Sequence, residues 1–242
     1  MGLIPVPSHT QADREMWATL AEADLAYASL PVFQRRAEQA RSAISEFVAD
    51  GPCYLSVSWG KDSVTCAHLL WEVCQDKVLL VHIIQQPGEN PYNAIVRDAF
   101  LTRFPMPYQE VLADYTGIDG SENEIDRQTD KVFLRCFKKL PYTRYLSGIR
   151  RDESGGRAIR MMKHGLRSLN TLAPIGYWKI QDVYAYLAKH DLPIHPNYGM
   201  LGGGRWPRES LRVCRVGGVP GRGMGRLLWE NEYYSSFLRK HV

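Results

Sequence analysis

The residues best suited to chemistry form the run Ser58–Ser63, which reads Ser-Trp-Gly-Lys-Asp-Ser. A short β-rich run precedes it and an apolar-periodic run follows, so we expect a strand to turn into a helix there. Unpaired N–H groups and the dipole at a helix N-terminus hold phosphate oxygens. Gly60 would let the backbone approach such an anion, Lys61 would add a charge, and Ser58 and Ser63 would add hydroxyl donors. The spacing is not that of a Walker A loop, so the run predicts either another phosphate-binding loop or an ordinary capped turn.

Strands and helices alternate along the chain on both sides of this run. Strand-like runs cover residues 53–58, 78–84, 107–112, 143–149 and 168–174. Helical runs cover residues 11–49, 62–75, 91–104, 124–140 and 179–190. The alternation predicts βαβ units and therefore an α/β fold with a doubly wound, mostly parallel sheet. We expect an N-terminal helical segment at 1–50, an α/β domain at 51–198 and an irregular, basic Gly/Arg-rich C-terminal tail at 199–242.

Length and composition exclude several classes of protein. The chain has 242 residues, of which 45% are apolar, which is enough for one continuous core and too much for a disordered chain. It has no apolar run long enough to span a membrane and no secretory signal, so we expect a cytoplasmic protein. Its 5 cysteines include no Cys-x-x-Cys pair, which argues against a disulfide scaffold and a closed zinc site.

The net charge of +4 hides an asymmetry between the two halves of the chain. Residues 1–120 carry 8 Lys and Arg against 15 Asp and Glu, whereas residues 121–242 carry 22 against 11. Within 135–167, ten basic residues are opposed only by Asp152 and Glu153. A one-sided basic half predicts an anionic partner such as a nucleotide or nucleic acid, with a solvated, ion-paired surface as the alternative.

Three further segments follow the Ser58–Ser63 run in order. They read Gly-Ile-Arg-Arg-Asp-Glu-Ser-Gly-Gly-Arg at 148–157, Pro-Ile-Gly-Tyr-Trp-Lys-Ile-Gln-Asp-Val-Tyr at 174–184 and Leu-Pro-Ile-His-Pro-Asn-Tyr at 192–198. With these four segments the chain resembles the PP-loop ATP pyrophosphatase superfamily, and within it the phosphoadenosine-phosphosulfate (PAPS) reductase-like branch. The resemblance covers residues 53–198 and implies a PP-loop nucleotide-binding domain with a fold like that of the adenine nucleotide alpha hydrolases.

The resemblance also implies which residues bind ATP and Mg²⁺. The nucleotide would be held by Ser56, Ser58, Gly60, Lys61, Asp62, Ser63, Glu89, Gly148 and Arg157. Lys61 and Asp62 would be catalytic, and Asp62 would bind the metal that bridges the phosphates. Arg150 and Arg151 would also be catalytic, through contacts to the α-phosphate or to an anionic substrate, because a planar guanidinium suits that task. Ordinary surface ion pairs are the alternative role for these arginines.

Two departures from the branch concern thiols. Its reductases attack sulfate with a cysteine in a C-terminal Glu-Cys-Gly-Leu-His segment, and no cysteine follows Cys214 here, so we do not expect reduction by that route. Members with an iron–sulfur cluster carry paired cysteines where this chain has the single Cys136 and Cys214, so we expect no cluster. Basic neighbours should favour the thiolate forms of Cys136 and Cys214, and we expect these two residues to be catalytic sulfur carriers. The alternative is that both thiols are unreactive. Cys53, Cys66 and Cys74 should lie in the core.

The predicted function is that of the ATP-pyrophosphatase component of DNA phosphorothioation systems. Such an enzyme would adenylate an oxygen, here of a DNA backbone phosphate, with release of pyrophosphate, and sulfur would then displace AMP. The expected partners are a cysteine desulfurase as sulfur donor, DNA and other phosphorothioation subunits, and a homodimer stays open. The alternatives are a sulfate-assimilation enzyme, similar to the small subunit of ATP sulfurylase or to a divergent PAPS reductase, and a non-catalytic nucleotide-binding module.

Overall fold

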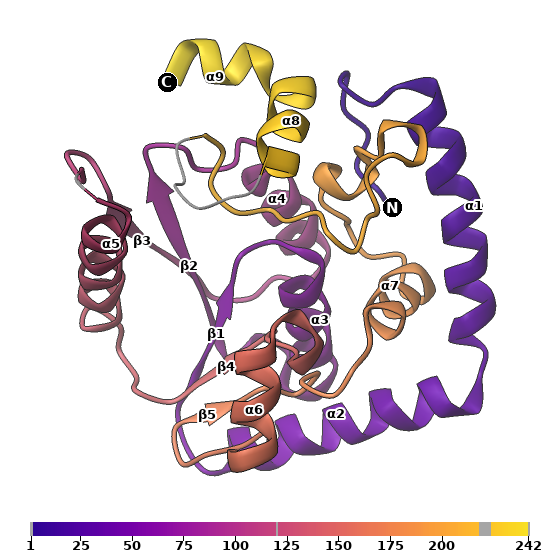
Figure 1. Ribbon diagram of the computed structural model, residues 1–242. Coiled ribbons are helices and arrows are strands. Elements are labelled where there is room, and N and C mark those ends of the chain that lie inside the picture. The colour runs from indigo at the N-terminus through magenta and orange to yellow at the C-terminus, as the bar shows by residue number, and fades with distance from the viewer. Residues whose placement is uncertain (1, 120, 218–223, 242) are drawn as a thin grey trace.

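Five parallel strands form the centre of the protein, in a computed structural model that describes residues 2–119, 121–217 and 224–241 (Figure 1). The strands are β1 (Tyr54–Val57), β2 (Leu79–Gln86), β3 (Tyr108–Asp114), β4 (Tyr145–Ser147) and β5 (Thr171–Leu172). Their order is β3-β2-β1-β4-β5, and each neighbouring pair is parallel. The chain thus builds one half of the sheet outward from β1 and then returns to build the other half. Sheets of this kind bind ligands where the order reverses, at the carboxyl ends of the central strands.

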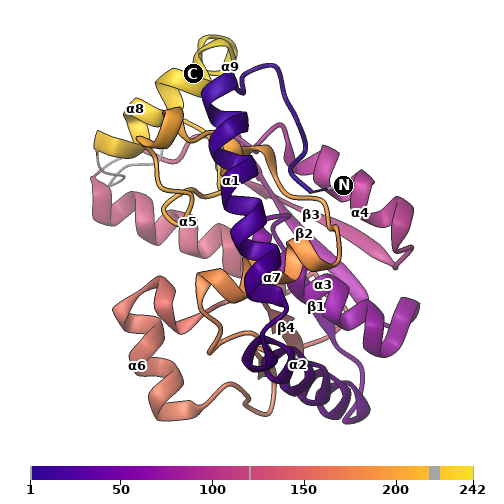
Figure 2. The same ribbon diagram turned by 90° about the vertical axis from the view of Figure 1, so that its right-hand side faces the viewer.

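Helices cover both faces of this sheet (Figure 2). They are α1 (Gln11–Ala28), α2 (Pro31–Ala49), α3 (Lys61–Cys74), α4 (Asn93–Arg103), α5 (Glu122–Phe137), α6 (Gly155–His164), α7 (Ile180–Lys189), α8 (Met224–Tyr233) and α9 (Ser235–His241). Short 3-10 turns are η1 (Gln75–Lys77), η2 (Arg151–Glu153), η3 (Pro196–Gly199) and η4 (Gly202–Gly204). α3 and α4 lie on one face, and α5 and α6 lie on the other. The doubly wound α/β fold predicted from the sequence is therefore confirmed.

Alternate residues of β2 face the two helical layers. Leu80 belongs to the main apolar core, whereas Val81 and Ile83 belong to a smaller apolar cluster that packs against α5. Side chains of a strand point alternately to opposite faces, so a strand covered on both sides reads as a continuous apolar run. This burial explains why residues 78–84 show no alternation of apolar and polar types.

Buried charges tie the first helix to the C-terminal part of the chain. Asp24 on α1 accepts two hydrogen bonds from Arg208, at 2.6 and 2.7 Å. Asp13, in the first turn of α1, accepts hydrogen bonds from the Leu201 N–H at 3.0 Å and from the Tyr233 hydroxyl at 3.0 Å. Removal of one partner from such a buried pair leaves an uncompensated charge and costs about 3–5 kcal/mol. These contacts fix the segment that follows residue 199 against α1.

The expectation of an irregular tail at 199–242 is wrong for its last part. Helices α8 and α9 form there, at the end of the molecule toward which β2 points (Figure 1). Residues 199–217 consist of short turns and extended backbone, as expected, and residues 218–223 lie outside the described part. None of the described helices combines the length and apolar character that a membrane span requires.

Candidate functional site

A cavity of about 320 Å³ opens at the carboxyl ends of β1 and β2. Its walls come from the loop between β1 and α3, from β2 and the loop after it, from α5, from η2 and α6, and from the C-terminal segment. Of the predicted site residues, those in the lining are Ser56, Ser58, Gly60, Lys61, Asp62, Glu89, Arg157 and Cys214. The predicted residues outside the lining are Ser63, Gly148, Arg150, Arg151 and Cys136.

The loop between β1 and α3 is closed by its own hydrogen bonds. Ser63 Oγ accepts a hydrogen bond from the Ser58 N–H at 3.2 Å and donates one to the Gly60 carbonyl at 3.0 Å. Gly60 is the N-cap of α3, and a Cβ there would lie 2.8 Å from Val213 Cγ2 and 3.0 Å from the Tyr198 hydroxyl. The absence of a side chain at this position therefore lets Val213 and Tyr198 pack against the start of α3, where the Tyr198 hydroxyl accepts a hydrogen bond from the Lys61 N–H at 3.3 Å.

Trp59 anchors the same loop from the other side. Its backbone has φ +58°, a left-handed conformation that costs a residue with a Cβ roughly 1–2 kcal/mol. Its ring is only 1% exposed and packs against the rings of Phe100 and Tyr108. Burial of a large aromatic side chain contributes more than this strain costs, because removal of a buried Trp side chain typically loses about 3–5 kcal/mol. The packing of Trp59 therefore offsets the strain in the backbone of the loop.

Lys61, Asp62 and Arg150 form a buried charged group below the loop. Asp62 Oδ2 accepts from Lys61 Nζ at 2.8 Å, and Asp62 Oδ1 accepts from Arg150 Nε at 2.6 Å. Burial alone would raise the pKa of Asp62, but the two cations outweigh it and hold the pKa below its usual value. Burial alone would lower the pKa of Lys61, but Tyr198 and Asp62 outweigh it and raise the pKa. Lys61 therefore stays charged at neutral pH and faces the cavity.

Asp62 and Glu89 accept hydrogen bonds on both carboxylate oxygens, whereas the contacts of Glu153 with described residues all involve its Oε2. Both oxygens of Asp62 already accept hydrogen bonds from cations. Glu89 accepts hydrogen bonds from three donors, and Glu153 accepts one from the Arg150 N–H and pairs with Arg157. In this arrangement Asp62 positions Lys61 and Arg150, and its role as a metal ligand stays a prediction.

Two predicted site residues of the 148–157 segment, Gly148 and Arg151, lie outside the cavity lining. A Cβ at Gly148 would lie 2.8 Å from the carbonyl carbon of Asp62 and 3.0 Å from the Ser63 nitrogen, so Gly148 lets β4 approach the first turn of α3. The Arg151 side chain is 47% exposed and pairs with Asp152 at 3.2 Å. Gly148 therefore supports the loop through packing, whereas Arg151 forms the surface ion pair that was the alternative for it.

Glu89 ends a hydrogen-bonded chain that starts on β1. Nδ1 of His82 lies 2.9 Å from the Val57 carbonyl oxygen, and Nε2 of the same ring lies 2.9 Å from Glu89 Oε1. The Gln85 N–H donates to Glu89 Oε2 at 2.8 Å. Burial alone would raise the pKa of Glu89, but the hydrogen bonds from His82 and Gln85 outweigh it and lower the pKa. Glu89 thus presents a fixed, ionised carboxylate at the cavity wall.

The sequence interpretation predicted Cys214 but missed the other residues of one wall of the cavity. Tyr198, Arg212, Val213 and Arg215 line it, and all of them come from the C-terminal part of the chain. The Val216 N–H donates to the Gly88 carbonyl at 2.7 Å, which joins this segment to the loop after β2. The sequence signals for this wall were Cys214, the Gly/Arg-rich composition of the tail and the tyrosine that ends the 192–198 run.

The two predicted sulfur carriers lie in different surroundings. Cys214 is partly exposed and lines the cavity. Cys136 is 2% exposed, and its thiol donates to the Leu112 carbonyl at 3.5 Å. Burial raises the pKa of the Cys136 thiol and outweighs Lys139, so the expectation that basic neighbours favour its thiolate is wrong. Arg215 stacks over the ring of Tyr115 at 5.3 Å, and that ring belongs with Cys136 to the cluster under α5. The sulfur-carrying role of both cysteines stays a prediction.

The remaining thiols and a histidine cluster lie away from the cavity. Cys53, Cys66 and Cys74 are buried, as expected for core residues. His68, Glu72 and His190 place their potential ligand atoms within 4.8 Å of one another. The Tyr186 hydroxyl fills this group, because it donates to Glu72 at 2.7 Å and lies 2.9 Å from His68 Nδ1. Burial, and then the nearby His190, lower the pKa of His68 to about 4, so His68 is neutral at physiological pH.

The second half of the chain, from α5 to the C-terminal wall of the cavity, is similar to a known family. Residues 120–219 match the family model of the phosphoadenosine phosphosulfate reductase domain. The phosphoadenosine 5'-phosphosulfate reductase of Xanthomonas axonopodis pv. citri is 42% identical over 82 residues. That of Cronobacter sakazakii is 35% identical over 80 residues. Each match covers 33% of this chain and 33% of the relative, so the chain spans about a third of the length of these curated relatives.

Two solved structures show a distant likeness over more of the chain. The PAPS reductase from Candida auris, in a phosphate complex, aligns with a TM-score of 0.47 and 14% identity, over 73% of this chain and 87% of that one. The U34-tRNA thiolase NcsA from Methanococcus maripaludis, with its 4Fe-4S cluster, aligns with a TM-score of 0.48 and 16% identity, over 87% and 80%. The family match supports the PAPS reductase-like resemblance read from the motifs. The expected absence of an iron–sulfur cluster stays a prediction.

Proposed function

We propose that the protein is an ATP pyrophosphatase that adenylates a backbone phosphate oxygen of DNA and so prepares it for sulfur insertion. One observation carries the proposal: the N-terminus of α3, Lys61, Arg157 and Arg212 meet in one cavity. A helix N-terminus supplies N–H donors to phosphate oxygens, and guanidinium groups form charge-assisted, bidentate hydrogen bonds with phosphate. The sequence match of residues 120–219 to the phosphoadenosine phosphosulfate reductase domain also supports this proposal.

The chain's own residues would divide the work between binding and charge stabilisation. The β- and γ-phosphates would lie against Ser58, Gly60 and the first turn of α3. Lys61 would stabilise the charge that develops on the leaving pyrophosphate, and its buried pairing with Asp62 fixes it in place before the reaction. Preorganised donors of this kind commonly contribute a hundredfold or more to the rate, about 3 kcal/mol or more each. Glu89, ionised at the opposite wall, would accept a hydrogen bond from a ribose hydroxyl.

The proposed reaction has two displacements and a reduction. An oxygen of the acceptor phosphate attacks the α-phosphorus of ATP, the bond to the β-phosphate oxygen breaks, and pyrophosphate leaves. The terminal sulfur of a protein persulfide then attacks the acceptor phosphorus, and AMP leaves with the acceptor's oxygen. A second thiol attacks the sulfur–sulfur bond, which frees the thiophosphate and leaves a disulfide that an external thiol reduces. The persulfide would come from a cysteine desulfurase, and Cys214 at the cavity wall would receive it.

Sulfate assimilation is the second candidate, and the named relatives favour it. Phosphoadenosine 5'-phosphosulfate reductases match a third of the chain at up to 42% identity. A sulfate oxygen in place of a DNA phosphate oxygen would use the same cavity and the same cations. The two candidates therefore differ in acceptor and share the nucleotide site.

Product analysis with a panel of acceptors tests the proposal. ATP labelled on the α-phosphate is incubated with the protein and with sulfate, duplex DNA or RNA in turn, with and without a cysteine desulfurase and cysteine. We expect AMP and pyrophosphate, with turnover that depends on DNA and that is about a hundredfold or more slower for Lys61→Met. Products of ADP and phosphate would refute a pyrophosphatase, and turnover that depends on sulfate would establish the second candidate.

A further inference from the structure

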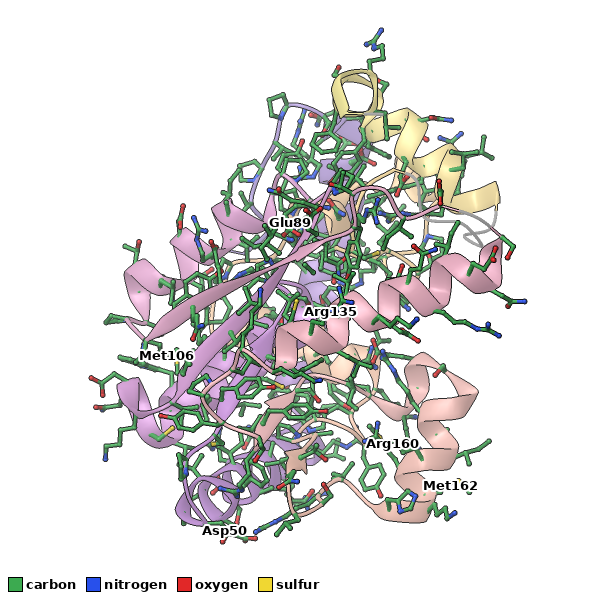
Figure 3. The ribbon with its side chains drawn as sticks, turned by 90° about the vertical axis from the view of Figure 1, so that its left-hand side faces the viewer. Asp50, Glu89, Met106, Arg135, Arg160 and Met162 are labelled. Atoms are coloured by element: carbon green, nitrogen blue, oxygen red, sulfur yellow. The ribbon has the colours of Figure 1, made fainter. Side chains whose placement is uncertain are left out.

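Helices α5 and α6 flank the mouth of the cavity on the same side of the sheet. Phe133 of α5 and Arg157 of α6 both line the cavity. Figure 3 looks onto this side of the molecule, with Arg135 labelled on α5 and Arg160 on α6. Any large molecule that reaches the cavity from this side must therefore cross the surfaces of these two helices.

The outward faces of both helices carry exposed cations. On and just after the C-terminal half of α5 these are Lys131, Arg135, Lys138 and Lys139, and on α6 they are Arg160 and Lys163. None of the six forms an ion pair with a side chain that the structure describes. Single exposed cations without such a pair, for example Arg35 and Lys77, occur elsewhere on the surface, but these six are gathered on two helices that flank one cavity. Like charges gathered without partners destabilise the compact state, so their presence points to an anion from outside the chain.

Helix α6 also has an unusual pattern of burial. Met161 is buried and anchors the helix, but Ile159 is 67% exposed and Met162 is 80% exposed. The outward face of α6 therefore combines apolar side chains with Arg160 and Lys163. A helix C-terminus favours nearby cations by about 0.3–1 kcal/mol, which can account for a single lysine there. That effect does not explain apolar side chains left in water beside the cations.

We propose that this α5–α6 surface, defined by Lys131, Arg135, Lys138, Lys139, Arg160 and Lys163, binds the sugar–phosphate backbone of a polynucleotide. The strand would cross both helices and present one phosphate to the cavity, with Ile159 and Met162 against its sugars or unstacked bases. The identity of the polynucleotide as acceptor rests on the proposed function. The binding itself does not, because it requires neither ATP nor turnover.

A polynucleotide fits this surface better than a small anion does. Lys61, Arg157 and Arg212 already face the interior of the cavity, where a small anion would bind. The six cations of the α5–α6 surface lie outside the cavity lining and on two separate helices. One sulfate or nucleotide cannot contact them all, whereas a backbone with regularly spaced phosphates can.

The salt dependence of binding tests the α5–α6 surface directly. Affinity of the full chain for fluorescent oligonucleotides of one sequence, as duplex DNA, single-stranded DNA and RNA, is measured by anisotropy over a range of salt. The test variants are Arg135→Ala with Lys138→Ala, and Arg160→Ala with Lys163→Ala. The matched control is Arg35→Ala with Lys77→Ala, which removes two exposed cations from α2 and η1, and thermal melts check that every variant folds.

Each test variant should lower the slope of log affinity against log salt by about 2 for duplex DNA. At 0.1 M salt this loss corresponds to about 60-fold weaker binding, since each phosphate contact contributes about 0.9 to the slope. The control should bind like the wild type. Test variants that bind like the wild type, or a wild type that binds none of the three oligonucleotides, would overturn the proposal. A salt-sensitive complex with the desulfurase alone, lost in the variants, would also overturn it and assign the surface to a protein partner.

The failure of the surface and the failure of the proposed function give different results. If the wild type binds oligonucleotides, the test variants do not, and no AMP forms from ATP, the α5–α6 surface is supported and the pyrophosphatase activity is refuted. If the wild type forms AMP and pyrophosphate but binds no oligonucleotide, the pyrophosphatase activity is supported and the α5–α6 surface is refuted. ATP binding itself should be the same in the wild type and in both test variants.

Discussion

Gly148→Ala tests whether close backbone packing positions the Ser58–Ser63 loop. The added Cβ would lie 2.8 Å from the carbonyl carbon of Asp62, 2.9 Å from its oxygen and 3.0 Å from the Ser63 nitrogen. All three are backbone atoms in the first turn of α3, so no side-chain rotation relieves the overlap. Overpacking of this kind costs about 1–3 kcal/mol, and Ala recovers about 0.4–1 kcal/mol through the lower entropy of the unfolded chain. We expect a net loss of about 1–2 kcal/mol in the free energy of unfolding.

The same displacement should damage the site more than the fold. A shift of the first turn of α3 moves Asp62 away from Arg150, whose contact is only 2.6 Å long, and moves Lys61 with it. The assays are urea unfolding and the kcat and KM for ATP in pyrophosphate release. Gly156→Ala is the matched control, because nothing lies within 4 Å of the Cβ it would add, and it should be neutral or slightly stabilising with unchanged kinetics. Wild-type stability and kinetics for Gly148→Ala would refute the packing argument.

Three further predictions concern charge, pH and sulfur. Lys61→Met should fold and should lower kcat for pyrophosphate release by about a hundredfold or more, and a loss below tenfold would count against the loop as the phosphate site. The depressed pKa of about 4 for His68 means that the unfolded chain takes up this proton first, so stability should fall as pH drops from about 6.5 toward 4. At pH 5 the protonation of His68 should lower the free energy of unfolding by about 2 kcal/mol. Urea unfolding of the wild type and of His68→Gln at pH 7.5 and 5.0 should therefore show a smaller loss of stability at low pH in the variant. Cys214→Ser should keep ATP binding and lose sulfur incorporation measured by mass spectrometry, whereas Cys66→Ser should keep both, and normal incorporation by the Cys214 variant would remove it from the reaction.

Local spacing in the sequence was enough to find the loop and the sheet. The Ser58–Ser63 run lies between a strand and a helix as predicted, because both the apolar period and Gly60 act over a few neighbouring residues. The strand order could not come from such signals. It depends on which strands pair over long separations, as β1 does with β4.

The site features that the sequence did not predict depend on burial and on contacts between residues far apart in the chain. The basic neighbours of Cys136 suggested a thiolate, but the helix turns that thiol toward β3, where burial decides its pKa. The local sequence around Asp62 does not reveal its second partner, Arg150, which approaches from a segment 88 residues away. The wall formed by Arg212 and Cys214 depends on a backbone contact between Val216 and the loop after β2, which no local pattern encodes.

The origin of the oxygen in the product AMP tests the central claim most directly. Duplex DNA with oxygen-18 in its non-bridging phosphate positions is incubated with the protein, ATP, a cysteine desulfurase and cysteine, and the AMP is analysed by mass spectrometry. Adenylation of the backbone followed by displacement with sulfur places one oxygen-18 atom in AMP and leaves sulfur on the DNA. AMP that carries only oxygen from ATP and water, with unmodified DNA, would contradict adenylation of a DNA phosphate by this protein.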